Sequence, residues 1–325
     1  MTPSATRRSV LAAAATAALP SLARSQGWPA RSVTIVVPFP PGGIADQIAR
    51  PLAAHFQAAF GQPFVVENRP GAGGNIGADA VAKAAPDGHT LLLGSTGTLC
   101  INEFLYDRLP FDMRRAFAPI TLLVGTPMVL IVNPARPWRS LADYLAAARA
   151  SPGRITAGSA GSGSALHLTL ALFNAATGTD VQHVAYRGAA PAIVDLIAGT
   201  LDSMFDSVPH ALPHIRAGRV AALAVATASR LAVLPEVPTF GEAGLPGFVV
   251  SPWFGLAAPA RTPEAIIGRL HAAASEALRQ PGYGGRLAEI GAELLGGDPA
   301  AFSAFLEEER RRWEPVIRAG NIRAD

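Results

Sequence analysis

The stretch VTIVVPFPPGGIAD, residues 33–46, runs from strand-forming residues through a Pro/Gly turn into the start of a helix. The same succession recurs in ITAGSAGSGSALHL, residues 155–168. A helix that begins directly after such a turn has unpartnered backbone N–H groups at its first residues, and its dipole favours negative charge there. The two stretches therefore predict two anion-binding turns, placed on two lobes that close on an acidic small molecule.

The length and composition of the chain indicate a folded protein of two domains. Its 325 residues exceed what one ordinary core holds, and 50% of them are hydrophobic while 16% are charged. Strand and helix patterns alternate from residue 33 to residue 94. This alternation predicts an α/β fold in which helices cover the faces of a parallel sheet.

Two apolar segments, Thr121–Val132 and Trp253–Pro259, are expected to carry the chain from one lobe to the other and back. Two crossings are better explained by a discontinuous first lobe than by two sequential domains. We therefore predict a first lobe of residues 26–127 and 252–325 and a second lobe of residues 128–251.

Residues 1–25 have the pattern of a bacterial twin-arginine export signal. The pair Arg7 and Arg8 precedes an alanine-rich apolar stretch, and small residues follow it, so that cleavage after Ala23 or after Ser25 satisfies the small-x-small rule. An amphipathic or mitochondrial leader is the alternative. The pattern predicts a periplasmic protein exported by the twin-arginine route.

The charge balance of the mature chain argues against a nucleic-acid partner. The full chain has 27 Lys and Arg residues and 24 Asp and Glu residues, a net charge of +3. Residues 1–25 contain three of the arginines and no acidic residue, so the mature chain is neutral. Nucleic-acid binding needs a basic face, and we expect a monomer that binds no nucleic acid.

The serine-rich turn could belong to a hydrolase, but its pattern does not fit one. A nucleophile elbow needs Gly-x-Ser-x-Gly, and Ala160 stands at the serine position. His167 could act as a base, although no partner carboxylate is specified. Hydroxyls beside free backbone N–H groups are equally good donors to a bound carboxylate, so we expect no catalytic residue.

Asp206, His210 and His214 lie at intervals of four, a spacing that can gather metal ligands on a helix. Pro209 and Pro213 argue against a regular helix there. We expect neither a metal nor a cofactor.

Two other segments allow two interpretations, and a third allows one. Asn68–Gly77 is either a third ligand loop or a strand-to-helix turn with several positive φ angles. Tyr186-Arg187 ends a strand and either faces the cleft or lies at a solvated turn. Glu307–Arg312, three glutamates followed by three arginines, sets opposite charges three and four residues apart, which is typical of a solvated helix face.

Several segments, in their order and spacing, resemble one known family over essentially the whole mature chain: the periplasmic substrate-binding proteins of tripartite tricarboxylate transporters, the Bug family. The resemblance rests on Val36–Asp46, Val66–Gly74, Ala85–Thr90, Gly158–Ser164 with His167-Leu168, Tyr186–Gly188, Val237–Thr239, Glu242–Gly244 and Trp253–Gly255.

The resemblance implies a two-lobed periplasmic-binding-protein fold, a Venus flytrap of the type II kind, with a hinge of two crossings near residues 127 and 252. It also implies capture of a carboxylated metabolite. In the family, backbone groups and ordered waters of the two glycine loops hold one carboxylate, without an arginine. Preorganised dipoles can compensate the charge in this way without a buried ion pair.

The resemblance also implies a set of ligand-binding residues. The first loop supplies Gly42, Gly43, Ile44 and Asp46, the second supplies Ser159, Ala160, Gly161, Ser162, Gly163, Ser164 and His167, and Ser95, Thr96, Gly97, Tyr186 and Asp206 complete the set. Ser95–Gly97 and Asp206 are expected at the ligand's far end. The chain departs from the family at Asn102-Glu103, where members usually have Asn-Pro, and a charged Glu103 could alter the rim of the cleft.

The sequence thus predicts an extracytoplasmic receptor, not an enzyme, that binds a small mono-, di- or tricarboxylate and delivers it to the membrane permease subunits of a tripartite tricarboxylate-type transporter. Two alternatives stay open. The same cleft could serve a ligand-dependent periplasmic sensor of a membrane histidine kinase, or the chain could be an exported hydrolase.

Overall fold

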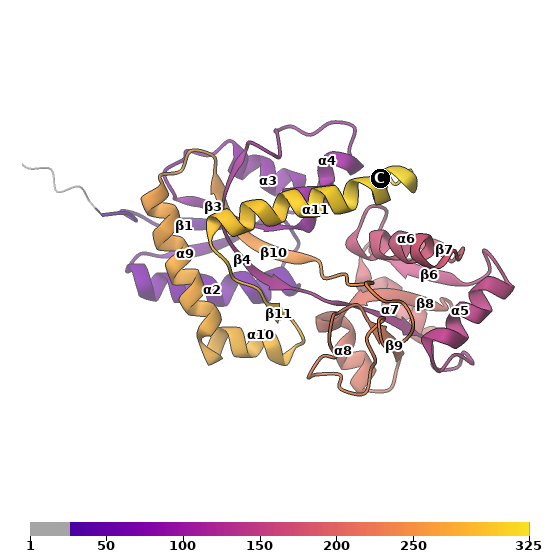
Figure 1. Ribbon diagram of the computed structural model, residues 1–325. Coiled ribbons are helices and arrows are strands. Elements are labelled where there is room, and N and C mark those ends of the chain that lie inside the picture. Colours follow the sequence, from indigo (N-terminus) through magenta and orange to yellow (C-terminus); the bar gives the residue numbers. More distant parts are fainter. Residues whose placement is uncertain (1–26, 325) are drawn as a thin grey trace, which may run out of the picture.

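The computed structural model describes residues 27–324 and contains two β-sheets, one in each of two lobes (Figure 1). The predicted export signal lies outside the described residues. The first sheet has the strand order β11-β4-β10-β3-β1-β2, and the second has the order β7-β6-β8-β5-β9. The predicted two-lobed α/β fold is confirmed.

The strands of the first sheet are β1 Val33–Val37, β2 Phe64–Asn68, β3 Thr90–Ser95, β4 Phe117–Gly125, β10 Trp253–Pro259 and β11 Glu293–Leu294. Those of the second are β5 Met128–Val132, β6 Thr156–Ser159, β7 Gln182–Ala185, β8 Ser203–Ser207 and β9 Ala221–Val225. The α-helices are α2 Ile44–Phe60, α3 Asn75–Ala82, α4 Asn102–Leu105, α5 Leu141–Ala150, α6 Ala165–Thr177, α7 Ala189–Ala198, α8 Val208–Arg216, α9 Glu264–Arg279, α10 Arg286–Glu289 and α11 Pro299–Ala319.

Helices cover both faces of the first sheet, because its strands are apolar on both sides. Successive residues of a strand point to opposite faces. In β1, Ile35 belongs to a core cluster with residues of α2 and α9, whereas Val36 belongs to a second cluster with residues of α3 and α11. The burial of both faces accounts for the continuous apolar run of the opening stretch.

Strand directions place the carboxyl ends of the parallel strands between the lobes. β1, β2 and β3 run parallel to one another, and β10 is antiparallel to both β3 and β4. β1, β2 and β3 therefore run in the same direction as β4, and β4 leads into the second lobe. In that lobe β8 is antiparallel to β5, and β6 and β7 run parallel to β8. Their carboxyl ends consequently point back toward the first lobe.

The chain crosses between the sheets after β4 and before β10. The segment Trp253–Pro259, expected to carry the chain back, is strand β10 of the first sheet. The two crossings are tied together. Thr126 donates from its N–H and its hydroxyl to the carbonyl of Pro252, at 2.6 and 2.8 Å, and Met128 N–H donates to the carbonyl of Val250 at 3.0 Å. The exact lobe boundaries remain a prediction.

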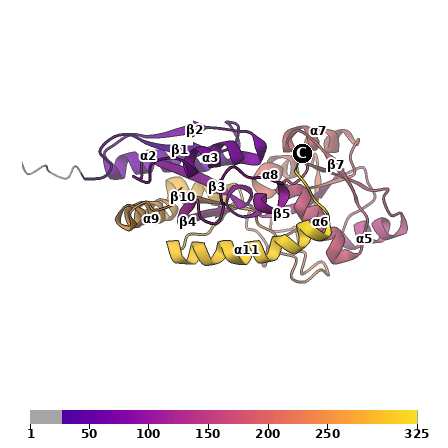
Figure 2. The same cartoon turned by 90° about the horizontal axis from the view of Figure 1, so that it is seen from above.

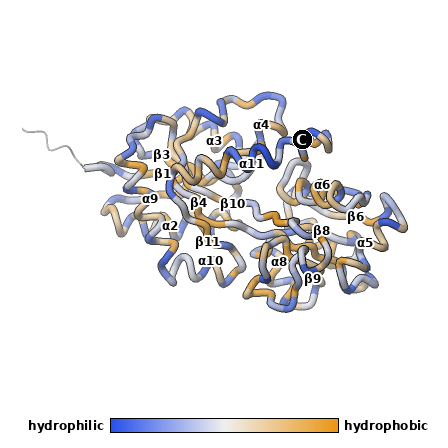
Figure 3. Tube along the Cα trace, viewed as in Figure 1, coloured by the Kyte–Doolittle hydropathy of each residue, from blue (hydrophilic) through white to orange (hydrophobic). Residues whose placement is uncertain are grey.

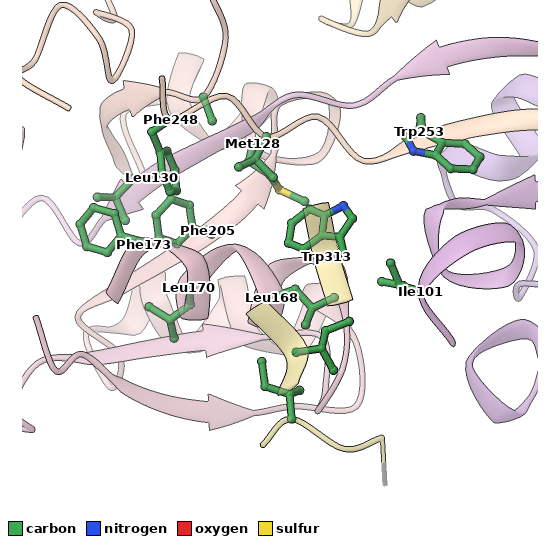
Figure 4. Close-up of a cluster of buried hydrophobic side chains, with 14 of the residues drawn as sticks. Ile101, Met128, Leu130, Leu168, Leu170, Phe173, Phe205, Phe248, Trp253 and Trp313 are labelled. Atoms are coloured by element: carbon green, nitrogen blue, oxygen red, sulfur yellow. The ribbon is translucent and has the colours of Figure 1, made fainter. Parts of the chain in front are cut away.

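α11 is a third link between the lobes that the sequence did not predict. It runs along the first sheet and ends beside α6 of the second lobe (Figures 1 and 2). Trp313 of α11 lies between Met128 and Leu168 in a core cluster that extends across both lobes (Figure 4). The C-terminal helix therefore packs against both lobes.

The expectation of a solvated face over Glu307–Arg312 is wrong for two of its residues. The middle of α11 is strongly hydrophilic (Figure 3), yet Glu309 and Arg310 are only 7% and 5% exposed. Glu309 Oε2 accepts the indole N–H groups of Trp253 at 2.9 Å and Trp313 at 3.1 Å. Buried partners on β10 and within α11 satisfy this carboxylate, and a sequence pattern does not show them.

The argument against a helix around Pro209 and Pro213 is also wrong, because α8 forms there. Pro209 lies in the first turn, where a backbone N–H has no partner to lose. Among residues 27–324 there is no helix that combines the length and the apolarity that a membrane crossing requires.

Candidate functional site

The two predicted glycine loops lie at the facing edges of the two sheets. The first loop follows the carboxyl end of β1, and the second, residues 159–164, follows that of β6. In open α/β sheets, ligands bind outside the carboxyl ends of the strands. Across the gap, a Cβ at Gly163 would lie 3.1 Å from the side chain of Leu105 in α4. The second loop thus reaches the first lobe.

The first loop presents consecutive backbone amides at the start of α2. Gly42 has φ 91°, a left-handed conformation that favours glycine, and its N–H donates to Asp46 Oδ2 at 2.8 Å. Gly43 is the N-cap, so the N–H groups of Ile44 and Ala45 cannot bond within the helix. The amides of Gly43, Ile44 and Ala45 have no acceptor among the described residues.

Asp46 holds this loop through its carboxylate. Its side chain is buried, and besides the Gly42 amide it accepts Asn68 Nδ2 at 2.8 Å and Arg50 Nε at 3.2 Å. Burial raises the pKa of this carboxyl, but the hydrogen bonds from Asn68, Gly42 and Arg50 outweigh it and lower the pKa below its ordinary value. The negative charge is therefore neutralised within the loop.

Some backbone amides of the second loop donate hydrogen bonds to side chains at the two ends of the loop. Gly161 N–H donates to Ser159 Oγ at 3.1 Å, and Gly163 N–H donates to Nδ1 of His167 at 3.1 Å. Ser164 caps α6, because its Oγ accepts the N–H of His167 at 3.3 Å. The amides that have no acceptor among residues 27–324 are those of Ala160, Ser162, Ala165 and Leu166.

His183 of β7 is a residue of this region that the sequence reasoning missed. Its Nε2 lies 2.6 Å from Ser159 Oγ, and its ring stacks on that of His167 with centroids 3.7 Å apart and planes at 5°. No motif marks His183. The pairing of β7 beside β6 brings it to the loop.

The contact between Ser159 and His183 has the distance of a nucleophile–base pair, but Ser159 is 0% exposed. A substrate carbonyl cannot approach a fully buried hydroxyl. The hydroxyl instead binds the N–H of Gly161 and shapes the loop, which argues against the hydrolase alternative.

Ser95 and Thr96, predicted at the far end of the ligand, are both buried and bind neighbouring backbone. Ser95 Oγ accepts the N–H of Thr98 at 3.4 Å. Thr96 Oγ1 accepts the N–H of Trp253 at 2.9 Å, which fastens the end of β3 to the second crossing. Gly97 follows them, and a Cβ there would lie 3.2 Å from Asn102 Oδ1.

Asp206 and Tyr186 end two parallel strands of the second sheet, and each has a partner within its lobe. Asp206 is 1% exposed and lies 2.5 Å from Nδ1 of His210. Burial raises the pKa of the Asp206 carboxyl, and the hydrogen bond to Asp206 raises the pKa of His210. Tyr186 donates to Asp195 at 2.7 Å, and burial together with that contact raises its pKa to about 12.

No group of three or more His, Cys, Asp or Glu side chains within the described part of the chain could hold a metal ion. Asp206, His210 and His214, whose spacing in the sequence can gather metal ligands on a helix, therefore do not form such a group.

Glu103 is not free to alter the rim of a cleft. Its two carboxylate oxygens bind Arg310 Nε at 3.0 Å and Arg114 Nε at 2.9 Å. It also borders a cavity of about 360 Å³ formed by α4 and the C-terminal residues, which is lined by none of the predicted ligand residues.

The glycines of Asn68–Gly77 have packing reasons. Gly71, Gly73 and Gly74 have positive φ, as predicted. A Cβ at Gly74 would lie 2.6 Å from the side chain of Thr98, and one at Gly77 would lie 2.8 Å from the carbonyl of Arg69. These close approaches favour the interpretation as a structural turn.

Comparison with known proteins agrees with this arrangement. Residues 48–322 match the family described as the tripartite tricarboxylate transporter family receptor. Protein BugT of Bordetella pertussis is 38% identical over 305 residues, which cover 94% of this chain and 94% of BugT.

Two solved structures from Rhodopseudomonas palustris are similar over nearly their whole length. Rpa4515 with adipate has a TM-score of 0.84 and 38% identity, over 91% of this chain and 99% of that one. MatC (Rpa3494) with bound malate has a TM-score of 0.79 and 38% identity, over 89% of this chain and 100% of that one. The family and these neighbours are solute-binding receptors, so the expectation of a receptor instead of an enzyme is confirmed. From the family match and these alignments, we conclude that the chain belongs to the tripartite tricarboxylate transporter receptor family, and to the Bug proteins within it.

Proposed function

We propose that this protein binds a small dicarboxylate between its lobes, with one carboxylate held by backbone amides of the two glycine loops. The observation that carries the proposal is a set of amides at both facing edges that have no acceptor among residues 27–324, at Gly43–Ala45 and at Ala160, Ser162, Ala165 and Leu166. Such amides at helix N-termini stabilise an anion without a cationic side chain. The similar proteins with adipate and malate support the same ligand class.

We further propose that the protein is exported by its N-terminal signal, acts in the periplasm as a monomer and delivers its ligand to a tripartite tricarboxylate-type permease. The membership in a transporter receptor family supports this role. The lobes would close on the ligand by bending at the paired crossings.

Calorimetry on the purified mature chain tests the ligand class. We expect adipate or malate to bind, and adipamide, the neutral diamide of adipate, to bind far more weakly, because it carries no charge for the amides to stabilise. A ligand present at 100 times its Kd should also raise the free energy of unfolding by about 2.7 kcal/mol. Binding of adipamide as tight as that of adipate would contradict the proposal.

Uptake by cells tests the delivery step. A strain without the gene should take up the labelled dicarboxylate more slowly than the parent, and the restored gene should return the rate. Unchanged uptake together with loss of a ligand-dependent transcriptional response would support the sensor alternative. N-terminal sequencing of the periplasmic protein tests export, and cleavage after residue 23 or 25 is expected.

A further inference from the structure

The shape of the second loop depends on two side chains that come from different elements. Ser159, at the end of β6, accepts the N–H of Gly161, and His167, in the first turn of α6, accepts the N–H of Gly163. Both amides are thereby turned away from any ligand. The alternate amides of Ala160 and Ser162 are left without an acceptor among the described residues.

His183 contacts both of these side chains. It lies on β7, whose parallel pairing with β6 sets Ala157 opposite His183 and Ser159 opposite Ala185. Its Nε2 is 2.6 Å from Ser159 Oγ, and its ring lies flat on the ring of His167 at 3.7 Å. One side chain therefore fixes both acceptors of the loop amides.

The hydrogen bonds around Ser159 are satisfied together when Nε2 of His183 carries its hydrogen. Ser159 Oγ then accepts from His183 and from Gly161 N–H, and its own hydrogen goes to the carbonyl of Gly161, 3.2 Å away. This arrangement uses both lone pairs and the hydrogen of the hydroxyl.

We propose that His183 is a positioning residue for carboxylate recognition: through Ser159 and His167 it selects which amides of the second loop face the ligand. The inference rests on the proposed function. Without His183, the Ser159 hydroxyl and the His167 ring would each gain alternative orientations, and the amides would no longer be preorganised for an anion.

Two substitutions separate the contacts of His183. His183→Phe keeps an aromatic ring to stack on His167 and removes the hydrogen bond to Ser159. His183→Gln keeps an N–H donor near the position of Nε2. We expect the Phe variant to bind adipate, or malate if the wild type binds malate more tightly, about tenfold more weakly, and the Gln variant to recover most of that loss.

A double-mutant cycle tests the route through Ser159. Ser159→Ala should weaken binding at least as much as His183→Phe, because it also removes the acceptor of the Gly161 N–H. The double variant should be no weaker than Ser159→Ala, because that variant has already lost the hydrogen bond to His183. Ser159 is fully buried, so its hydroxyl acts on the ligand only through the loop. His271→Phe is the matched control, because it removes a similar histidine–serine contact elsewhere: His271 Nδ1 lies 3.5 Å from Ser275 Oγ on α9 of the first lobe. It should bind like the wild type.

Amide hydrogen exchange tests the positioning independently of any ligand. In the Phe variant the amide of Gly161 should exchange about tenfold faster, because its acceptor is no longer held. Unchanged exchange at Gly161, full affinity in His183→Phe, or strictly additive losses in the cycle would each overturn the proposal. If His183→Phe does not fold, unchanged affinity in Ser159→Ala overturns it. If the wild type binds no dicarboxylate but the exchange prediction holds, the loop geometry is right and the proposed function is wrong.

Discussion

The two glycine loops occupy equivalent places in the two lobes but are held by different chemistry. The first loop is held by the Asp46 carboxylate, which accepts the Gly42 N–H, forms an ion pair with Arg50 and accepts a hydrogen bond from Asn68. The second is held by neutral groups, the Ser159 hydroxyl and the His167 ring. In both loops, some backbone amides donate to these side chains and others have no acceptor among the described residues. The comparison teaches that the backbone supplies the anion-binding groups, while side chains decide which of them are available.

The largest expected effect on ligand affinity comes from removing one of the backbone amides proposed to bind the carboxylate. Ala165→Pro removes one N–H at the first residue of α6, a position where proline fits a helix. A hydrogen bond to a charged group contributes about 1.5–3 kcal/mol, so the Kd for the dicarboxylate should rise about ten- to a hundredfold. Calorimetry measures this change.

Glu264→Pro is the matched control, because Glu264 is the exposed first residue of α9 and lies in no predicted site. Equal losses of affinity in the two proline variants would show that the backbone amide of Ala165 has no special role.

Asp46→Ala tests the anionic support of the first loop. It leaves the N–H of Gly42 and the donors of Arg50 and Asn68 without their acceptor, which should lower the free energy of unfolding by about 2 kcal/mol. Urea denaturation measures the change. Asp79→Ala, which removes a helical ion pair with the exposed Lys83, is the control and should lower the free energy of unfolding by only about 0.5 kcal/mol. A loss in Asp46→Ala no larger than the control would mean that the carboxylate does not support the loop.

Ser164→Ala tests the cap of the second loop, for which the first loop has only Gly43. Loss of an N-cap side chain costs about 1 kcal/mol. The unfolding midpoint in urea should fall accordingly, with an unchanged slope. Thr177→Ala, at the other end of the same helix, is the comparison. A Ser164→Ala variant as stable as the wild type would show that the Ser164 cap does not stabilise the protein.

The smallest effect is the pH dependence that distinguishes the two supports. Because the folded-state pKa of Asp46 is lowered, its contribution to stability is complete above the ordinary Asp pKa of about 3.9 and is lost as the pH falls through the lower folded value. The unfolding free energy of the wild type minus that of Asp46→Asn, measured from pH 6 downward, should therefore shrink in acid. A difference that stays constant over this range would mean that folding does not change the pKa of the Asp46 carboxyl.

Much of the fold could be predicted because its signals are local. β1 and α2 form where the opening stretch predicts a strand and the start of a helix, because an apolar run and a glycine turn specify these elements locally. Pro209 of α8 was misread because proline in the first turn of a helix costs little, whereas Pro213 is accommodated inside the helix. The candidate loops were found for the same local reason.

The sequence by itself determined that this protein has two strand–glycine turn–helix units on a two-lobed frame, because each unit is encoded in about fourteen consecutive residues. Only the tertiary structure decided which amides of those units are free, that His183 stacks on His167, that Glu309 binds two tryptophans, and that Glu103 is paired with Arg114 and Arg310. The physical reason is that each of these depends on partners distant in the chain or on the direction of one side chain, which strand pairing and helix packing set and no local pattern contains.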